Sequence, residues 1–440
     1  MGHDRGVVGA RTTGDRDRVG EGHEAGRTRP VTSEAVAGGA VVAVDDGRLG
    51  RVLARAMARA RVGWPREVPD LVREAARGLG LSEAWVFLAD LQQHRLVAMP
   101  DPASDVRHPT VAIEGSLGGR AYRLQRTQVS AGPPAVGWLP LIDGVERIGA
   151  LRVEAPALDE RTLADCEALA GLVALLVVSR AAFGDVIAQT TRRAAMSLQA
   201  ELLWGFLPPR TIGTRSVTSS AVLEPAYDVG GDAFDHSMIG NVLHLSVFDA
   251  MGHDLAAGGA SAVALAACRS TRRAGGSLAE VATTIDRTLV EWIPGRLLTA
   301  VLADLDTTTG RLTWVNCGHP SPLLIRARRV LPDALGRRPQ LPLGLGFHSD
   351  TAPVTHHTGL EPGDRLLFYT DGVTEARSAD GELYGEARLA ETIVHHMAGG
   401  DPAPEALRRL IHSLMAHQDH RLRDDATLVL AEWHPVRPGA

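Results

Sequence analysis

The chain has 440 residues, of which 45% are hydrophobic and 22% charged, and a formal net charge of −6. These values describe a globular protein of two or three domains and argue against a general binder of nucleic acid or anionic membranes. The sequence contains no lysine, which excludes Walker A nucleotide hydrolases and Schiff-base enzymes, because both need one.

The cysteines and the apolar segments bear on the cellular compartment. Cys166, Cys268 and Cys317 lie far apart and match neither a disulfide framework nor a zinc-binding pattern. The longest strongly apolar run, residues 168–178, is shorter than the roughly 20 residues that span a bilayer. The N-terminus shows no secretory signal pattern. We therefore expect a cytoplasmic protein without a membrane partner.

Residues 1–50 are rich in Gly, Arg and Asp and lack periodicity, so we expect them to be disordered. Residues 51–180 form the first predicted domain. Its pattern predicts a helix around 68–75, strands at 84–91, 95–99 and 148–153, and a final helix over 163–179. The glycine-rich stretch 115–119 is interpreted as a turn rather than as a phosphate-binding loop, because it lacks the dinucleotide fingerprint.

The stretch from Pro140 to Val153 resembles the strand pair of GAF domains. The resemblance implies a regulatory domain, which either binds a small ligand or serves dimerisation and signal transmission. A connecting helix is predicted over 181–206, where Leu198, Leu202 and Phe206 recur at helical spacing. It is interpreted either as a packed or dimerising helix, giving a homodimer through both parts, or as a passive linker.

Residues 207–434 form the last predicted domain, followed by a tail at 435–440. A small-residue helix is expected over 256–267, and Ser277 with Glu280 forms a capping box that opens the next helix. Residues 298–306 and 311–317 are predicted to form a hairpin. Strands outnumber helices, and the helices fall between groups of strands. This order predicts an α+β fold, a layered β-sandwich flanked by helices.

Four aspartates, Asp232, Asp249, Asp371 and Asp424, lie at the edges of strand-like apolar runs. An acid that ends one strand and an acid that opens its antiparallel neighbour meet at the same edge of a sheet. Carboxylates gathered there repel one another unless a divalent cation holds them, and oxygen ligands suit Mg²⁺ or Mn²⁺. The spacing therefore predicts a metal site.

The flanks of these aspartates belong to five short motifs in a fixed order. They are Gly-Gly-Asp-Ala-Phe-Asp at 230–235, Phe-Asp-Ala-Met-Gly-His at 248–253, Asn-Cys-Gly-His-Pro at 316–320, Tyr-Thr-Asp-Gly-Val-Thr-Glu at 369–375, and Asp-Asp-Ala-Thr at 424–427. Together they resemble the SpoIIE-like branch of the PPM/PP2C metal-dependent protein phosphatases. The resemblance covers roughly half of the chain.

The resemblance implies a role for each matching residue. Asp249 would bridge two Mn²⁺ or Mg²⁺ ions and the backbone carbonyl of Ala250 would help to hold one, while Asp232 would serve the second metal. Asp371 and Asp424 would complete the first. Four further residues are expected to support the ligands from behind: Asp235, Asp425, His253 and Gly372.

The chemistry that these residues support is in-line attack on phosphorus. Water bridging two cations loses a proton near neutral pH, and the metals neutralise charge on the phosphoryl oxygens. His253 and His319 could protonate the leaving oxygen, although a structural role at a turn is the favoured interpretation of both. Two departures from the family pattern concern the rim of the site. Only one aromatic residue, Phe234, lies between Asp232 and Asp235 of the first motif, and Asp254 stands in place of the usual glycine.

The leading hypothesis is a phosphoserine/phosphothreonine protein phosphatase with an N-terminal regulatory module. The resemblance implies a bacterial signalling circuit with a phosphorylated anti-sigma-factor antagonist as substrate. The alternative is a catalytically weak module that binds a phosphoprotein under the control of the GAF-like domain. A metal nuclease is disfavoured, because many such sites use a lysine and the charge does not suit a polyanion.

Overall fold

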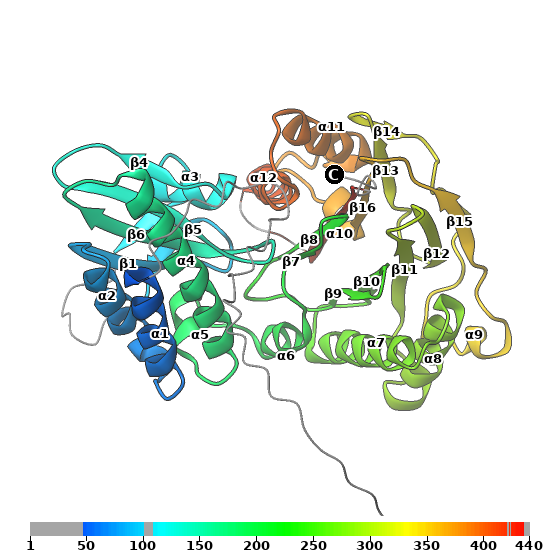
Figure 1. The fold of residues 1–440 in the computed structure, drawn as a ribbon. Helices are drawn as coiled ribbons and strands as arrows, with labels where there is room; N and C mark the ends of the chain where they lie inside the picture. The colour runs from blue at the N-terminus through cyan, green and yellow to red at the C-terminus, as the bar shows by residue number, and fades with distance from the viewer. Residues whose placement is uncertain (1–46, 101–108, 420–421, 423, 435–440) are drawn as a thin grey trace, which may run out of the picture. The chain divides into compact units, whose positions relative to one another are not determined.

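The computed structural model describes residues 47–100, 109–419, 422 and 424–434 (Figure 1). The disorder expected for residues 1–50 therefore falls mostly outside the described residues, as does the tail at 435–440. Residues 48–50 are a correction to that expectation, because helix α1 (Arg48–Ala60) already begins there. Leu49, Ala56 and Ala60 of this helix are buried, and burial of this apolar face stabilises an amphipathic helix.

The N-terminal domain is a six-stranded sheet in the order β3-β2-β1-β6-β5-β4, with all of its strand pairs antiparallel. After α1 its elements are η1 (Pro65–Glu67), α2 (Val68–Gly78), β1 (Glu83–Ala89), β2 (Arg95–Ala98), β3 (Thr110–Ala112), α3 (Leu117–Leu124), β4 (Gln128–Ser130), β5 (Ala135–Asp143), β6 (Glu146–Ala155) and α4 (Glu160–Ala181). The helix at 68–75 and the strands at 84–91, 95–99 and 148–153 are confirmed. The glycine-rich stretch is not only a turn, because Ser116 caps α3 and Gly118 and Gly119 lie inside it.

Helix α4 contains the long apolar run of the sequence. Among the described residues it is the one helix whose length and composition would allow it to cross a membrane, with a mean hydropathy of 1.8. Its residues Cys166, Leu169 and Val173 are buried against α1, α2 and the sheet in one apolar cluster. The apolar run thus contributes a core helix to this domain.

The connection between the domains is not the single helix expected over 181–206. It is α5 (Val186–Thr191) and α6 (Leu198–Phe206), separated by residues 192–197. The break has a physical cause, because Arg192 is extended and the Ser197 side chain accepts a hydrogen bond from the Ala200 amide and starts a new helix. Ala200 and Leu203 are buried in the core of the C-terminal domain, so α6 belongs to that domain.

The C-terminal domain consists of two antiparallel sheets with helices on the outside of each. Its elements are β7 (Thr211–Gly213), β8 (Val217–Glu224), β9 (Asp232–Ile239), β10 (Val242–Ala250), α7 (Leu255–Arg273), α8 (Leu278–Trp292), β11 (Leu298–Asp306), β12 (Arg311–Cys317), β13 (Leu323–Arg326), β14 (Arg329–Leu331), α9 (Phe347–Asp350), β15 (His356–Gly359), β16 (Arg365–Tyr369), α10 (Asp371–Thr374), α11 (Gly385–Ala398), α12 (Ala403–His417) and β17 (Ala426–Trp433). The sheet orders are β15-β12-β11-β10-β9 and β14-β13-β16-β17-β8-β7.

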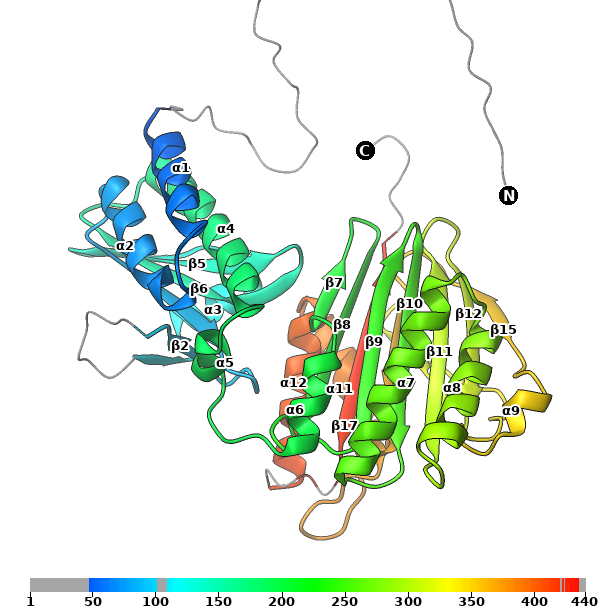
Figure 2. The ribbon, with the colours of Figure 1, turned by 90° about the horizontal axis from the view of Figure 1, so that it is seen from below.

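The layers follow from which faces are apolar. Helices α7 and α8 lie side by side on the first sheet, as Figure 2 shows. Helices α11 and α12 pack against the second sheet in a separate apolar cluster. Buried alanines let α7 approach the sheet closely, among them Ala257, Ala260 and Ala264. The capping box at Ser277 and the β11–β12 hairpin are confirmed. The mixed architecture with antiparallel sheets and flanking helices is the one expected from the sequence.

Candidate metal centre

The four predicted aspartates lie at the ends of strands in both sheets of the C-terminal domain. Asp232 is the first residue of β9 and pairs in register with Asp249 near the end of β10. Asp371 begins α10 directly after β16. Asp424 lies just before β17, the antiparallel neighbour of β16. The sheet pairing thus brings together residues that are far apart in the sequence.

The pKa values of Asp232, Asp249 and Asp371 are raised by burial and by the negative charges of the neighbouring aspartates. Burial, followed by the charges of Asp371, Asp424 and Asp425, raises the pKa of Asp249 to about 7. Burial and the charges of Asp249 and Asp425 raise the pKa of Asp232 well above its usual range. The pKa of Asp371 is raised by burial and then by Asp424. A carboxylate cluster that repels itself is one that a cation would stabilise.

Two threonines hold the carboxylate of Asp232. Its Oδ2 accepts hydrogen bonds from Thr370 Oγ1 and Thr427 Oγ1, both at 2.7 Å. The Thr427 amide in turn donates to Thr370 Oγ1 at 2.9 Å. Both threonines lie in the aspartate motifs but were not assigned a role from the sequence. Thr370 directly follows β16 and Thr427 lies on β17, so the two threonines join β9 to the other sheet and fix one oxygen of Asp232.

Asp425 supports the site through the backbone. Its Oδ2 accepts hydrogen bonds from the amides of Gly230, Gly231 and Asp232 at 2.8, 2.7 and 3.1 Å. Three backbone donors converging on one carboxylate oxygen fix the loop that leads into β9. The role predicted for Asp425, to position a ligand rather than to bind the metal, stays a prediction.

Two glycines allow the backbone segments around the aspartates to approach closely. A Cβ atom on Gly231 would lie 2.4 Å from the Ala250 carbonyl oxygen. One on Gly372 would lie 1.9 Å from the Asp425 carbonyl oxygen. Neither distance can accommodate a side chain. The Ala250 carbonyl, a predicted ligand, therefore faces the loop that carries Asp232.

The structure places Asp235 in a different environment. It lies three residues after Asp232 on β9 and therefore on the opposite face of the strand. Both of its oxygens form ion pairs with α7, to Arg269 Nη2 and Arg272 Nη1 at 2.6 Å each. These contacts tie β9 to α7, and the supporting role predicted for Asp235 reduces to this structural link.

The two candidate histidines differ in exposure. His253 is exposed in the loop after β10, and its backbone covers Gly230. His319 is buried, and its Nδ1 lies 2.8 Å from the Oγ1 of Thr299, the register partner of Asp249. Burial lowers the pKa of His319 to about 4. At neutral pH it is therefore uncharged, in line with a structural role.

The donor set fits divalent cations. Among the described residues, no group of three or more His, Cys, Asp or Glu side chains is already spaced to hold a metal ion. The strand ends nevertheless supply Asp232, Asp249, Asp371 and Asp424 as oxygen donors, and burial and mutual repulsion raise the pKa values of the first three. Hard cations such as Mg²⁺ and Mn²⁺ are bound by such oxygens.

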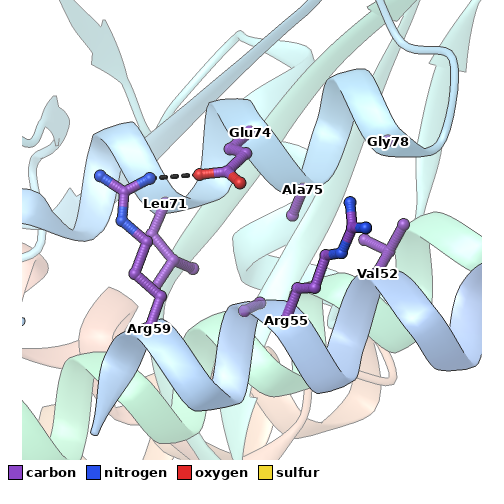
Figure 3. Close-up of a pocket in the computed structure, with 8 residues that line it drawn as sticks. Val52, Arg55, Arg59, Leu71, Glu74, Ala75 and Gly78 are labelled. Atoms are coloured by element: carbon purple, nitrogen blue, oxygen red, sulfur yellow. Dashed lines mark hydrogen bonds and ion pairs between the residues drawn. The ribbon is translucent and has the colours of Figure 1, made fainter. Parts of the chain in front are cut away.

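A pocket in the N-terminal domain has different chemistry. It lies between α1 and α2 and has a volume of ≈ 60 Å³, with Arg55 and Arg59 of α1 on one side and Leu71 and Ala75 of α2 on the other (Figure 3). Arg59 forms an ion pair with Glu74 on α2. None of the predicted site residues lines this pocket. It is therefore separate from the aspartate cluster.

Comparisons with known proteins agree with the motif pattern. Residues 240–434 match the family model of stage II sporulation protein E (SpoIIE). The phosphoserine phosphatase RsbU of Bacillus subtilis is 24% identical over 212 residues, which is 48% of this chain and 61% of RsbU. Protein IcfG of Synechocystis is 27% identical over 126 residues, which is 28% of this chain and 19% of IcfG. The chain thus spans less than two thirds of the length of either relative.

Two solved structures are also similar. The PP2C domain of SiaA from Pseudomonas aeruginosa has a TM-score of 0.45 at 20% identity and covers 53% of this chain and 94% of that domain. The RsbU and RsbW domains of a Mycobacterium tuberculosis protein give 0.43 at 27% identity, over 50% and 62% of the two chains. The match to the family model over residues 240–434 and the similarity to RsbU support the predicted resemblance of this part of the chain to SpoIIE/PP2C-type phosphatases.

Proposed function

We propose that this protein is a phosphoserine/phosphothreonine protein phosphatase that depends on two Mn²⁺ or Mg²⁺ ions. The observation that carries the proposal is the gathering of four aspartates at strand ends by the sheet pairing, where burial, and after it the neighbouring carboxylates, raises the pKa of Asp249 to about 7. Such a cluster destabilises the folded protein in the absence of a cation, and cation binding would offset this cost.

The residues divide into ligands and their supports. Asp249 and the Ala250 carbonyl, with Asp232, would hold the ions on the side of the first sheet. Asp371 and Asp424 would hold one on the side of the second. Bound cations would supply the positive charge that activates water and neutralises the phosphoryl oxygens. Thr370, Thr427 and Asp425 would keep the Asp232 carboxylate and its loop in place.

The substrate class is proposed from the relatives. RsbU is named a phosphoserine phosphatase, and the cluster of aspartates suits metal-assisted hydrolysis. We infer a phosphorylated protein as substrate, with an anti-sigma-factor antagonist as the kind that the SpoIIE resemblance implies. The protein would act in the cytoplasm.

The N-terminal domain is proposed to regulate this activity as a GAF-like module. Its six-stranded antiparallel sheet with α3 on one face and α1, α2 and α4 on the other is compatible with the predicted resemblance. Aromatic side chains, including Phe87 and Trp138, fill the face beneath α3. This packing favours dimerisation or signal transmission over a large ligand at that face.

The decisive experiment is turnover of a phosphoserine peptide and of p-nitrophenyl phosphate by the full chain. Activity should require Mn²⁺ or Mg²⁺, disappear with a chelator and fall at least 100-fold in Asp249→Asn. Asp304→Asn, on β11 of the same sheet, is the control and should retain activity. Full activity in Asp249→Asn would rule out the metal mechanism. Mn²⁺ and phosphopeptide binding without turnover would instead favour the alternative of a phosphoprotein-binding module.

A further inference from the structure

The loop after β10 joins two predicted metal-binding positions to helix α7. Residues 251–253 lie between Ala250 and Asp254, the N-cap of α7. The last sheet hydrogen bond of this strand runs from the Met251 amide to the Leu297 carbonyl at 3.0 Å. Beyond it, Gly252 turns the chain with a φ of +94°, and residues 251–254 are exposed.

One guanidinium group holds both ends of this loop. Arg296 Nη1 donates to the Met251 carbonyl at 3.2 Å, and Arg296 Nη2 donates to Asp254 Oδ2 at 2.6 Å. The other oxygen of Asp254 accepts from the Ala257 amide at 2.9 Å and caps α7. Because the guanidinium is planar and rigid, binding both acceptors fixes their relative position.

The opposite side of the loop lies against the residues that lead into β9. A Cβ on Gly231 would be 2.4 Å from the Ala250 oxygen and 2.8 Å from the Gly252 oxygen. The Ala250 amide donates to the Gly231 carbonyl at 3.3 Å. The loop is thus enclosed by Gly231 on one side and Arg296 on the other. Without Arg296, the carbonyl of Met251, the residue that follows Ala250, would lose its side-chain donor.

We propose that Arg296, together with Asp254, is a positioning residue that holds the Ala250 carbonyl and the start of α7 in metal-binding geometry. This inference rests on the proposed metal-dependent function. It also gives a role to Asp254, which stands where the family pattern has glycine: one of its oxygens pairs with Arg296 and the other caps α7. Surface ion pairs contribute little to global stability, so the role of this pair is local.

The test is Mn²⁺ binding by the full chain, measured by isothermal titration calorimetry, with amide hydrogen exchange of residues 250–254 in the metal-free protein. Arg296→Gln is expected to raise the Mn²⁺ dissociation constant about tenfold, as for other residues that orient metal ligands, and to speed exchange in the loop. Asp254→Asn keeps the capping oxygen but loses the charge, so it should show a smaller effect. Arg296→Lys should recover only part of the affinity.

Arg388→Gln is the matched control, because Arg388, on α11, forms a comparable exposed pair with Glu382 at 2.8 Å. It should leave both readouts unchanged. The positioning role is overturned if Arg296→Gln binds Mn²⁺ within twofold of the parent and its loop exchange is unaltered. If Asp249→Asn also binds Mn²⁺ like the parent, the proposed metal site itself fails. If Asp249→Asn loses Mn²⁺ and Arg296→Gln does not, only the role of Arg296 fails.

Discussion

Thr427 and Asp232 are 195 residues apart in the sequence, and the Thr427 hydroxyl donates to Asp232 Oδ2 at 2.7 Å. The bond connects β17 of one sheet to β9 of the other. Because the Asp232 side chain is buried, an oxygen that lost this donor could not recover a hydrogen bond from bulk water. The contact makes the position of a predicted ligand dependent on the packing of the two sheets.

Replacing Thr427 with valine keeps the shape of the side chain and removes the donor. We expect Mn²⁺ affinity to fall about tenfold, because hydrogen bonds to charged groups contribute about 1.5–3 kcal/mol and residues behind metal ligands have effects of this size. Thr370→Val should behave in the same way, since Thr370 donates to the same oxygen. Calorimetric titration with Mn²⁺ measures the effect.

Thr218→Val provides the control for this pair, because Thr218 lies on β8 in register with Glu432, away from the aspartates. Its Mn²⁺ affinity should equal that of the parent. Unchanged affinity in both Thr370→Val and Thr427→Val would mean that Asp232 needs neither threonine.

The aspartate cluster should make the metal-free protein less stable as the pH rises. The pKa of Asp249 is about 7 in the folded chain against 3.8 in the unfolded chain, so the folded state binds the extra proton between these values. The free energy of unfolding then falls from about pH 4 to pH 7, and the loss is largest above pH 7. Asp249→Asn removes this charge and should stabilise the chelator-treated protein by about 1–3 kcal/mol at pH 8.

Thermal or urea unfolding in the presence of a chelator, at pH 5 and pH 8, checks this prediction. The gain in Asp249→Asn should be small at pH 5 and large at pH 8. Added Mn²⁺ should reverse the order by stabilising the parent only. A variant that is less stable than the parent at pH 8 without metal would show that Asp249 does not experience the repulsion.

A buried histidine should make the protein sensitive to acid. His236 Nε2 donates to the Pro209 carbonyl at 2.7 Å, so its Nδ1 accepts from Ser219 Oγ at 2.9 Å. Burial lowers the pKa of His236 to about 4 from 6.5. The unfolded state therefore binds more protons between these values. Stability from this group is complete above about pH 6.5 and is lost as the pH falls through about 4, by up to about 3 kcal/mol.

His236→Gln should flatten the pH dependence of the free energy of unfolding between pH 6.5 and 4, although it lowers stability at pH 7. Urea unfolding over this range measures the slope. The exposed His395 supplies the control, because His395→Gln should keep the slope of the parent. Equal slopes in the parent and His236→Gln would show that another group is responsible.

Local sequence patterns were sufficient for what depends on neighbouring residues. The aspartates at strand ends, the capping box at Ser277 and the β11–β12 hairpin could be predicted, because strand alternation and capping act over a few residues. The same holds for the small-residue helix, whose alanines mark a face that packs closely on a sheet.

What the sequence did not reveal depends on partners far along the chain. The hydrogen bond between Thr427 and Asp232 and the contact between Arg296 and Asp254 depend on the tertiary structure, because these residues are distant in the sequence. Asp235 carries the same charge as Asp232 and lies in the same motif, yet its face of β9 meets the arginines of α7. Ser197 could have been recognised as an N-cap, and this signal would have divided the predicted connecting helix.

Two glycine substitutions should have opposite effects on stability. In Gly231→Ala the new Cβ would lie 2.4 Å from the Ala250 carbonyl oxygen, which is backbone that cannot move without opening the loop. We expect a loss of about 1–3 kcal/mol and weaker Mn²⁺ binding. In Gly259→Ala the Cβ meets no atom within 4 Å, and alanine inside α7 should add about 0.5–1 kcal/mol.

Urea unfolding of the two variants and the parent, with parallel Mn²⁺ titrations, makes the comparison. Both changes add one methyl group within 30 residues of each other, so a difference in sign can arise only from the local surroundings. Gly259→Ala should leave metal binding intact. Normal Mn²⁺ affinity in Gly231→Ala would show that the contact with Ala250 does not control the metal centre, because the carbonyl would then tolerate displacement.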